Sequence, residues 1–364
     1  MSKRIAINTG GGDAPGLNGV IYAVTMAASS RGWSVYGIRD GYDGLLRSEN
    51  YPQGGIVELT PRTVQGIGRQ GGTILGTTNR GDPLAYPVLD SSSNWRKVNR
   101  SKEVVDRLTA EGFDAFIAMG GDGSLTIAQA LHELGLKVIG IPKTIDNDLD
   151  QTVVTFGFDS AVQFATECID RLCSTAQAHG RIMVVEVMGR YAGWIAISAG
   201  LSGVADAVLI PEIPYDISKV SAAAERAKKR QGYAIVVVAE GCCTENGELS
   251  VKAQRLGQKE QLGGIGERVC KALEERSGIE SRSVSLGHLV RGGSPTAIDR
   301  MLSFRFGAAA VRAVEQGISG VMITLEPQEV RYVPLSLVAG RTRKVPVEGD
   351  LVRTVRDLGI CLGD

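Results

Sequence analysis

The sequence predicts a doubly wound α/β fold with largely parallel sheets. Short runs rich in Val and Ile recur along the chain, and most of them are followed by a glycine turn. Their near-continuous apolar character suits strands that are buried on both faces of a parallel sheet. Longer helix-compatible segments lie between these runs, and the resulting order of strand, turn and helix is typical of α/β proteins.

The individual elements follow from these patterns. Eight apolar runs are predicted as strands: Ile5–Ile7, Val35–Ile38, Ala115–Met119, Val138–Ile141, Ile182–Val187, Val208–Ile210, Ala234–Ala239 and Val321–Ile323. Two segments carry an apolar stripe at helical spacing, Leu17–Ser30 and Leu125–Leu134. We predict a surface loop over the polar stretch Asp90–Arg100 and a solvated helix end at residues 228–230. Ligands are expected at the carboxyl ends of the strands, where the glycine turns lie.

Composition limits the classes of function. The chain has 364 residues, which suggests two domains at roughly 150 residues each. Forty Lys and Arg residues balance 40 Asp and Glu residues, so net charge gives no reason to expect nucleic acid or an anionic membrane as partner. Six cysteines form no CxxC and only three histidines accompany them, which argues against a zinc site or a disulfide scaffold. Without a signal-peptide or membrane-spanning pattern, we expect a cytoplasmic protein.

Two glycine turns could hold phosphate. The first, at residues 10–16, lacks the glycine spacing of a dinucleotide fingerprint and the Lys-Ser/Thr of a P-loop. Its backbone could still cradle an anion before a helix, although a plain tight turn explains it equally well. The second turn, at residues 120–124, contains Asp122, which could hold Mg²⁺, and Ser124, which could cap the next helix. Asp122 could instead be a carboxylate that the helix dipole favours.

The segment Pro142–Asp148 contains two carboxylates. In an extended loop Asp146 and Asp148 would point to the same side, which suits proton abstraction from a substrate hydroxyl. An Asn/Asp turn is the alternative. Further along the chain, Arg181 precedes a strand, and an extended segment with Arg282, His288 and Arg291 ends at two glycines. Arginines of this kind bind phosphate, but each could also form an ordinary surface ion pair.

Five motifs together resemble the 6-phosphofructokinase family. They are GGGDAPGLN near the start, GGDGS at 120–124, PKTIDND at 142–148, VEVMGRYAG at 185–193 and LGHLVRGGSP at 286–295. Their order and spacing agree with the family over most of the chain. The ending VPLSLVAGRTRKVP…LGICLGD is similar to the branch whose members use either ATP or pyrophosphate.

The resemblance implies a donor site and a sugar site. Gly11, Arg80, Gly121, Asp122, Gly123 and Ser124 would bind the phosphoryl donor, with Asp122 on Mg²⁺; Asn79 is an alternative in the register of Arg80. Asp146 would take the proton of the fructose 1-hydroxyl, with Asp148 assisting and Thr144 and Arg190 completing the catalytic set. The sugar phosphate would be bound by Thr144, Ile145, Asp146, Met188, Gly189, Arg190, Glu240, Arg282, His288 and Arg291, joined by Arg181 from a neighbouring subunit.

The resemblance also sets expectations for donor and architecture. Gly123 is the residue of ATP users, whereas Lys143 resembles pyrophosphate users; we favour ATP because steric exclusion of a nucleotide is harder to evade. We expect a donor domain over 1–160 and about 294–345, a sugar-phosphate domain over 161–293 and about 346–364, and the active site in the cleft between them. The substrates would be ATP and fructose 6-phosphate, and the assembly a homodimer or homotetramer.

Three alternative functions remain open from the sequence. They are a pyrophosphate-dependent enzyme, a kinase of another sugar phosphate, and a non-catalytic subunit that binds sugar phosphate. The last of these is expected to lose the base or the metal carboxylate, and this chain retains Asp122, Asp146 and Asp148.

Overall fold

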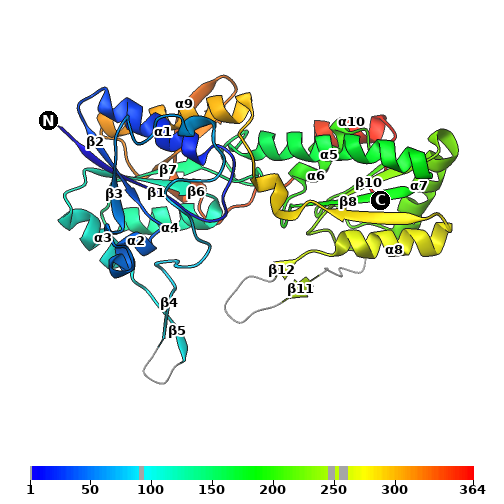
Figure 1. Ribbon diagram of the computed structural model, residues 1–364, viewed down its shortest axis with the longest axis horizontal. Helices are drawn as coiled ribbons and strands as arrows, with labels where there is room; N and C mark the ends of the chain where they lie inside the picture. The colour runs from blue at the N-terminus through cyan, green and yellow to red at the C-terminus, as the bar shows by residue number, and fades with distance from the viewer. Residues whose placement is uncertain (1, 90–93, 245–250, 254–260) are drawn as a thin grey trace. The chain divides into compact units, whose positions relative to one another are not determined.

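The computed structural model describes residues 2–89, 94–244, 251–253 and 261–364 (Figure 1). The chain divides into two compact units, which we treat separately. Unit 1 contains residues 1–145, 149–157 and 291–341, and unit 2 contains residues 146–148, 158–290 and 342–364. Neither unit is a continuous segment of the chain.

Within the described residues, unit 1 is built on a seven-stranded sheet with the order β15-β14-β7-β6-β1-β2-β3. Its strands are β1 (Arg4–Thr9), β2 (Ser34–Ile38), β3 (Ile56–Leu59), β6 (Ala115–Gly120), β7 (Val138–Pro142), β14 (Val321–Glu326) and β15 (Glu329–Pro334). The five central strands are parallel, whereas β3 and β15 pair antiparallel at the two edges.

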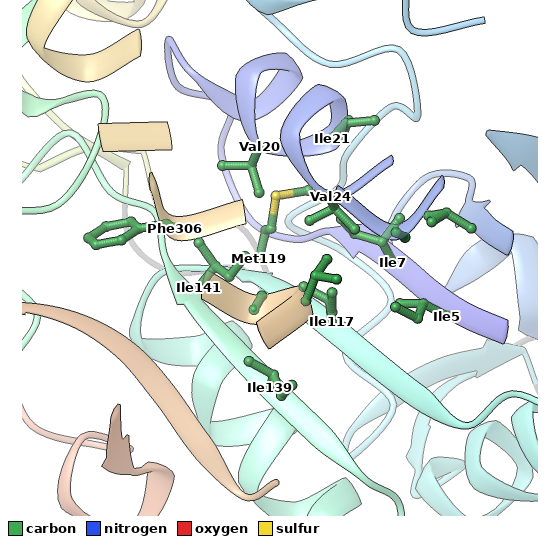
Figure 2. Close-up of a cluster of buried hydrophobic side chains, with 14 of the residues drawn as sticks. Ile5, Ile7, Val20, Ile21, Val24, Ile117, Met119, Ile139, Ile141 and Phe306 are labelled. Atoms are coloured by element: carbon green, nitrogen blue, oxygen red, sulfur yellow. The ribbon is translucent and has the colours of Figure 1, made fainter. Parts of the chain in front are cut away.

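Helices cover both faces of this sheet. They are α1 (Leu17–Ser29), α2 (Asp43–Leu46), α3 (Ser101–Ala110), α4 (Asp122–Glu133) and α9 (Ala297–Glu315). On one face, α1 and α9 pack on isoleucines of the central strands, with Val20 and Val24 above Ile7 and Ile117 (Figure 2). On the other face, residues of α3 and α4 form a second buried cluster with the sheet. The apolar side chains of the strands are therefore buried on both faces, as the sequence predicted.

Unit 2 contains a four-stranded parallel sheet with the order β13-β8-β10-β9 among the described residues. Its strands are β8 (Ile182–Val187), β9 (Ala207–Leu209), β10 (Ala234–Ala239) and β13 (Ser281–Ser285). Its helices are α5 (Phe158–His179), α6 (Trp194–Ser202), α7 (Ile217–Gln231), α8 (Ile265–Ser277) and α10 (Asp350–Asp357). The predicted α/β class with parallel sheets is confirmed, and so are all eight predicted strands and both predicted helices.

Shorter elements complete the structure. They are the antiparallel pair β11 (Val251–Ala253) and β12 (Gln261–Leu262), and the 3-10 helices η1 (Ser48–Asn50), η2 (Ile67–Arg69), η3 (Gly287–Arg291) and η4 (Leu335–Leu337). No helix among the described residues is long and apolar enough to cross a membrane.

The predicted surface loop at residues 90–100 is wrong in part. A hairpin of β4 (Tyr86–Leu89) and β5 (Trp95–Val98) occupies this region, and residues 90–93 lie outside the described chain. All four residues of β5 are exposed, so no buried face imposes the alternation of apolar and polar residues that identifies a strand. The basic run at 228–230 does lie in the last turn of α7, as predicted.

The contact between α1 and α9 gives a test of the fold. A Cβ on Gly307 of α9 would lie 2.8 Å from the Cβ of Ala23 and 2.9 Å from the carbonyl oxygen of Val20. Gly307→Val should therefore lower the free energy of unfolding by about 1–3 kcal/mol through overpacking. Ala308→Val, at a half-buried neighbouring position, is the control and should change it by less than about 0.5 kcal/mol. Thermal unfolding of both variants makes the comparison, and equal stability would contradict the packing described here.

Candidate active site

The two glycine turns of unit 1 meet at Ser124. The Gly10 amide donates to the carbonyl of Met119 at 2.8 Å, which joins the ends of β1 and β6. A Cβ on Gly10 would lie 2.6 Å from Ser124 Oγ, and one on Gly120 would lie 2.1 Å from Ser124 Cβ. The Ser124 side chain therefore occupies the space where side chains at both glycines would be. The prediction that Ser124 caps the helix is wrong, because α4 begins at Asp122 and its N-cap is Gly121.

Three polar side chains converge on Gly11. From the position of a Cβ on this glycine, Lys143 Nζ is 3.4 Å away, Ser124 Oγ 3.7 Å and Asn79 Oδ1 3.9 Å. Gly11 has a φ of +77°, a left-handed conformation that glycine adopts without strain. Lys143 is only 4% exposed, and its Nζ donates a hydrogen bond to the carbonyl of Gly12. The first turn therefore has a buried lysine beside it.

The loop at residues 73–80 closes on the same turn. The Thr77 hydroxyl donates to the Gly11 carbonyl at 2.6 Å, and the Gly11 amide donates to the Thr78 carbonyl at 3.2 Å. Arg80 is exposed and its amide donates to Thr78 Oγ1 at 2.9 Å. The side chain beside Gly11 is thus that of Asn79, one residue earlier in the chain. This geometry favours the alternative register that the sequence left open.

Asp122 and Gly123 form the first turn of α4. The Asp122 carboxylate accepts a hydrogen bond from the Gly340 amide at 2.7 Å, through Oδ1. No group of three or more potential metal ligands is found among the described side chains. This does not argue against Mg²⁺, which commonly binds through one or two carboxylates and takes its other ligands from water and substrate phosphates. Gly123 is exposed, and a Cβ built on it meets no atom within 4 Å.

Arg291 also belongs to unit 1. A Cβ on Gly12 would lie 2.0 Å from Arg291 Nη1, so the guanidinium rests directly on the first glycine turn. The predicted extended segment through Arg282, His288 and Arg291 is wrong, because β13 ends at Ser285 and η3 holds His288 and Arg291. His288 is exposed and lies in unit 2. The three residues are therefore spread over two structural elements and both units.

In unit 2, the VEVMGR motif lies beside Glu240. The Glu240 amide donates to the Val187 carbonyl at 2.9 Å, and the Gly241 amide donates to the Gly189 carbonyl at 3.1 Å. A Cβ on Gly241 would lie 2.1 Å from the carbonyl oxygen of Arg190. Residues 188–190 and Glu240 thus come together at the carboxyl ends of β8 and β10. Ligands of parallel sheets bind at these ends.

The PKTIDND segment divides between the units. Thr144, whose carbonyl accepts from the Thr155 hydroxyl at 2.6 Å, and the buried Ile145 belong to unit 1. Residues 146–148 belong to unit 2, and the buried Asn147 has a φ of +51°. The extended form of this loop is not found, since the left-handed residue between the two aspartates makes it the Asn/Asp turn that the sequence left open as the alternative. Asn is among the residues that tolerate this conformation best.

Arg181 and Arg282 lie at the opposite end of the unit 2 sheet. Arg181 precedes β8, and Arg282 pairs in register with Met183 near the beginning of that strand. Their guanidinium groups share one carboxylate, with Arg181 Nε 2.8 Å and Arg282 Nη2 2.5 Å from oxygens of Glu280. The hydrogen bond from Arg181 holds the pKa of Glu280 below its ordinary value. A six-residue strand is about 20 Å long, so neither arginine reaches Glu240 within one chain.

Comparison with known proteins places these motifs in a family. The phosphofructokinase family model matches residues 4–314. An ATP-dependent 6-phosphofructokinase of Chloroflexus aggregans is 48% identical over 364 residues, covering 100% of this chain and 98% of its own. A pyrophosphate–fructose 6-phosphate 1-phosphotransferase of Amycolatopsis methanolica is 43% identical over 351 residues, covering 95% and 97%. The structure of Pichia pastoris phosphofructokinase has a TM-score of 0.79 at 30% identity, covering 93% of this chain and 35% of that one. The chain belongs to the phosphofructokinase family.

Proposed function

We propose that this protein is an ATP-dependent 6-phosphofructokinase, which transfers a phosphoryl group to the 1-hydroxyl of fructose 6-phosphate. The observation that carries the proposal is the pair of candidate sites, one in each unit, in a chain of this family. Unit 1 gathers a buried lysine, two glycine turns and the Asp122 carboxylate. Unit 2 gathers an aspartate turn, an arginine motif and a glutamate. Phosphoryl transfer depends mainly on positioning and charge neutralisation, which these groups supply.

The donor phosphates belong with the first two turns of unit 1. Gly11 leaves the backbone open to an anion, and Lys143 supplies a positive charge within a few ångströms of it. The backbone N–H groups at the beginning of α4, at residues 121–124, can add further donors. Asp122 would hold Mg²⁺ together with the donor phosphates, and the ion would neutralise their charge during transfer. Arg80 and Arg291 are further cations of this unit.

The acceptor belongs with the residues of unit 2. Asp146 would accept the proton of the 1-hydroxyl, with Asp148 on the same turn. Arg190 would stabilise charge on the transferred group, since a guanidinium can bind two phosphate oxygens at once. Glu240 is an acceptor for sugar hydroxyls beside Met188 and Gly189. His288, together with Thr144 and Ile145 of unit 1, completes the set that we assign to the sugar phosphate.

Gly123 and the environment of Lys143 support ATP as the donor. The open space around Gly123 means that the fold does not require a glycine there, so its small size serves the ligand. Lys143 has a structural task in this chain, because it donates to the Gly12 carbonyl from a buried position. Its presence therefore does not by itself indicate pyrophosphate. Pyrophosphate is the second candidate donor, because the Amycolatopsis relative at 43% identity is named for it.

Arg181 and Arg282 support a shared site in an oligomer. They lie side by side on Glu280 and far from Glu240 in the same chain. Two arginines on one exposed carboxylate could exchange it for a phosphate presented by a neighbouring subunit. We therefore assign both of them to the 6-phosphate of the partner's substrate, in a homodimer or homotetramer.

Replacement of the proposed base gives a direct test. Asp146→Asn should lower kcat by a factor of about 10² or more, because the amide cannot accept the proton, while the KM for fructose 6-phosphate stays within about threefold. Asp150→Asn makes the same chemical change four residues later and should leave kcat unchanged. A coupled assay for fructose 1,6-bisphosphate measures both. Wild-type turnover in Asp146→Asn would remove this residue as the base.

Donor choice is tested at Gly123. With ATP, pyrophosphate and ADP compared in one assay, the wild type should use ATP. Gly123→Asp should retain the wild-type Tm, because a side chain there meets open space, and should lower kcat/KM for ATP by about tenfold or more. Gly123→Ala introduces a smaller, uncharged side chain as the control and should lower kcat/KM for ATP by less than Gly123→Asp does. If the wild type turns over with pyrophosphate alone, the donor is pyrophosphate and not ATP. If it turns over with none of the three donors, the substrate is another sugar phosphate or the protein only binds sugar phosphate.

A further inference from the structure

A short segment of the chain, residues 342–345, holds the aspartate turn in unit 2. The amide of Arg343 donates to the carbonyl of Asp148 at 2.7 Å. The guanidinium of the same residue donates to the carbonyl of Asn147 twice, from Nη2 at 2.8 Å and from Nε at 3.2 Å. One residue thus satisfies two successive carbonyl groups of the turn. We call residues 342–345 the strap.

The other side of the Arg343 guanidinium faces an aromatic ring. Its carbon lies 4.6 Å from the ring centroid of Trp194, the first residue of α6, at a distance typical of a cation–π contact. The Trp194 indole Nε1 in turn donates to the Arg343 carbonyl at 3.0 Å. The guanidinium is therefore fixed by stacking on one side while its N–H groups point at Asn147. A lysine cannot reproduce this combination of a planar fork and a stacked face.

Glu212 anchors the strap on its far side. It accepts from the Val345 amide at 2.8 Å and, with both carboxylate oxygens, from the Gly193 amide at 3.1 Å. Gly193 ends the motif that begins at Val185 and contains Arg190. The strap is thus bonded both to the turn that carries Asp146 and to the motif that carries Arg190.

The conformation of Asn147 gives a reason for such support, although Asn tolerates it better than most residues. Its φ of +51° is a conformation that costs a non-glycine residue free energy, and such residues persist where the surroundings determine them. The Asn147 carbonyl is the group that Arg343 binds. We propose that Arg343 is a positioning residue for Asp146, which fixes the turn so that the carboxylate meets the substrate hydroxyl. This inference rests on the proposed function, in which Asp146 is the base.

The test compares two substitutions of Arg343 with a matched control. Arg343→Met keeps much of the stem but loses both bonds to Asn147, and should lower kcat about 10- to 100-fold while each KM stays within about threefold. Arg343→Lys keeps one hydrogen-bond donor and should recover part of the lost kcat. If Arg343→Met does not fold, the comparison is made between Arg343→Lys and the wild type. Arg353→Met makes the same exchange at an exposed arginine of α10 and should behave as wild type.

A double-mutant cycle separates positioning from general stability. If Arg343 acts through Asp146, then Arg343→Met should lower kcat by less than about threefold in the Asp146→Asn background. Hydrogen exchange gives a second readout, independent of activity: amides of residues 146–150 should exchange faster in Arg343→Met than in wild type or Arg353→Met.

Each outcome decides a separate point. The inference is overturned if Arg343→Met has the kcat of the wild type. It is also overturned if the losses in kcat multiply fully in the double-mutant cycle, or if hydrogen exchange of residues 146–150 is unchanged in Arg343→Met. Wild-type protein that phosphorylates no fructose 6-phosphate would overturn the proposed function, and with it the proposal that Arg343 positions a catalytic base. In that case the exchange measurement still decides whether Arg343 holds the turn.

Discussion

The close approach of two turns at Ser124 is the constraint on which unit 1 depends. The backbone at Gly10 and Gly120 leaves no room for a Cβ beside the Ser124 side chain, so both positions must be glycine. Because β1 and β6 pair in parallel up to Thr9 and Met119, their carboxyl ends are adjacent, and Ser124 Oγ of α4 lies 3.7 Å from the Cβ position of Gly11. Lys143 can then sit beside the first turn from the end of the next strand, β7. The anion site that we propose there is thus a consequence of sheet geometry rather than of any single motif.

Burial on both faces of the sheets made the central strands predictable. Runs such as Ile5–Ile7 and Ala234–Ala239 have no solvent-facing side, so their composition alone identifies them. The edge strands β3 and β15 and the exposed hairpin of β4 and β5 lack this signal, because much of their surface faces water. Their pairing is determined by neighbours that are distant in sequence. Local pattern therefore predicted the centre of the sheet in unit 1 and missed its borders.

The position of a candidate motif in the fold was predictable where the motif directly follows a buried strand. The turns at residues 10–16 and 120–124 lie at strand ends, as expected, and so does Glu240 beside the VEVMGR motif. The left-handed φ of Asn147 and the 3-10 helix at 287–291 were not readable, since both depend on contacts made elsewhere. Arg343 gave no signal of its own: it lies some 200 residues from the turn that it binds. The position of Arg282 was not readable from the sequence either. Only the three-dimensional structure shows that it lies near the beginning of β13 and not at its carboxyl end.

The discontinuity of the units has a consequence for synthesis on the ribosome. In unit 1, β14 pairs with β7 and α9 packs on α1, so this unit cannot be completed until residues 291–341 have emerged. Until then the face of α1 that includes Ala23 has no helix to cover it. Unit 2 likewise needs residues 342–364, because the Val208 amide donates to the Cys361 carbonyl. Neither unit can therefore fold as an independent N-terminal domain, and both stay incomplete until their segments after residue 290 have emerged from the ribosome.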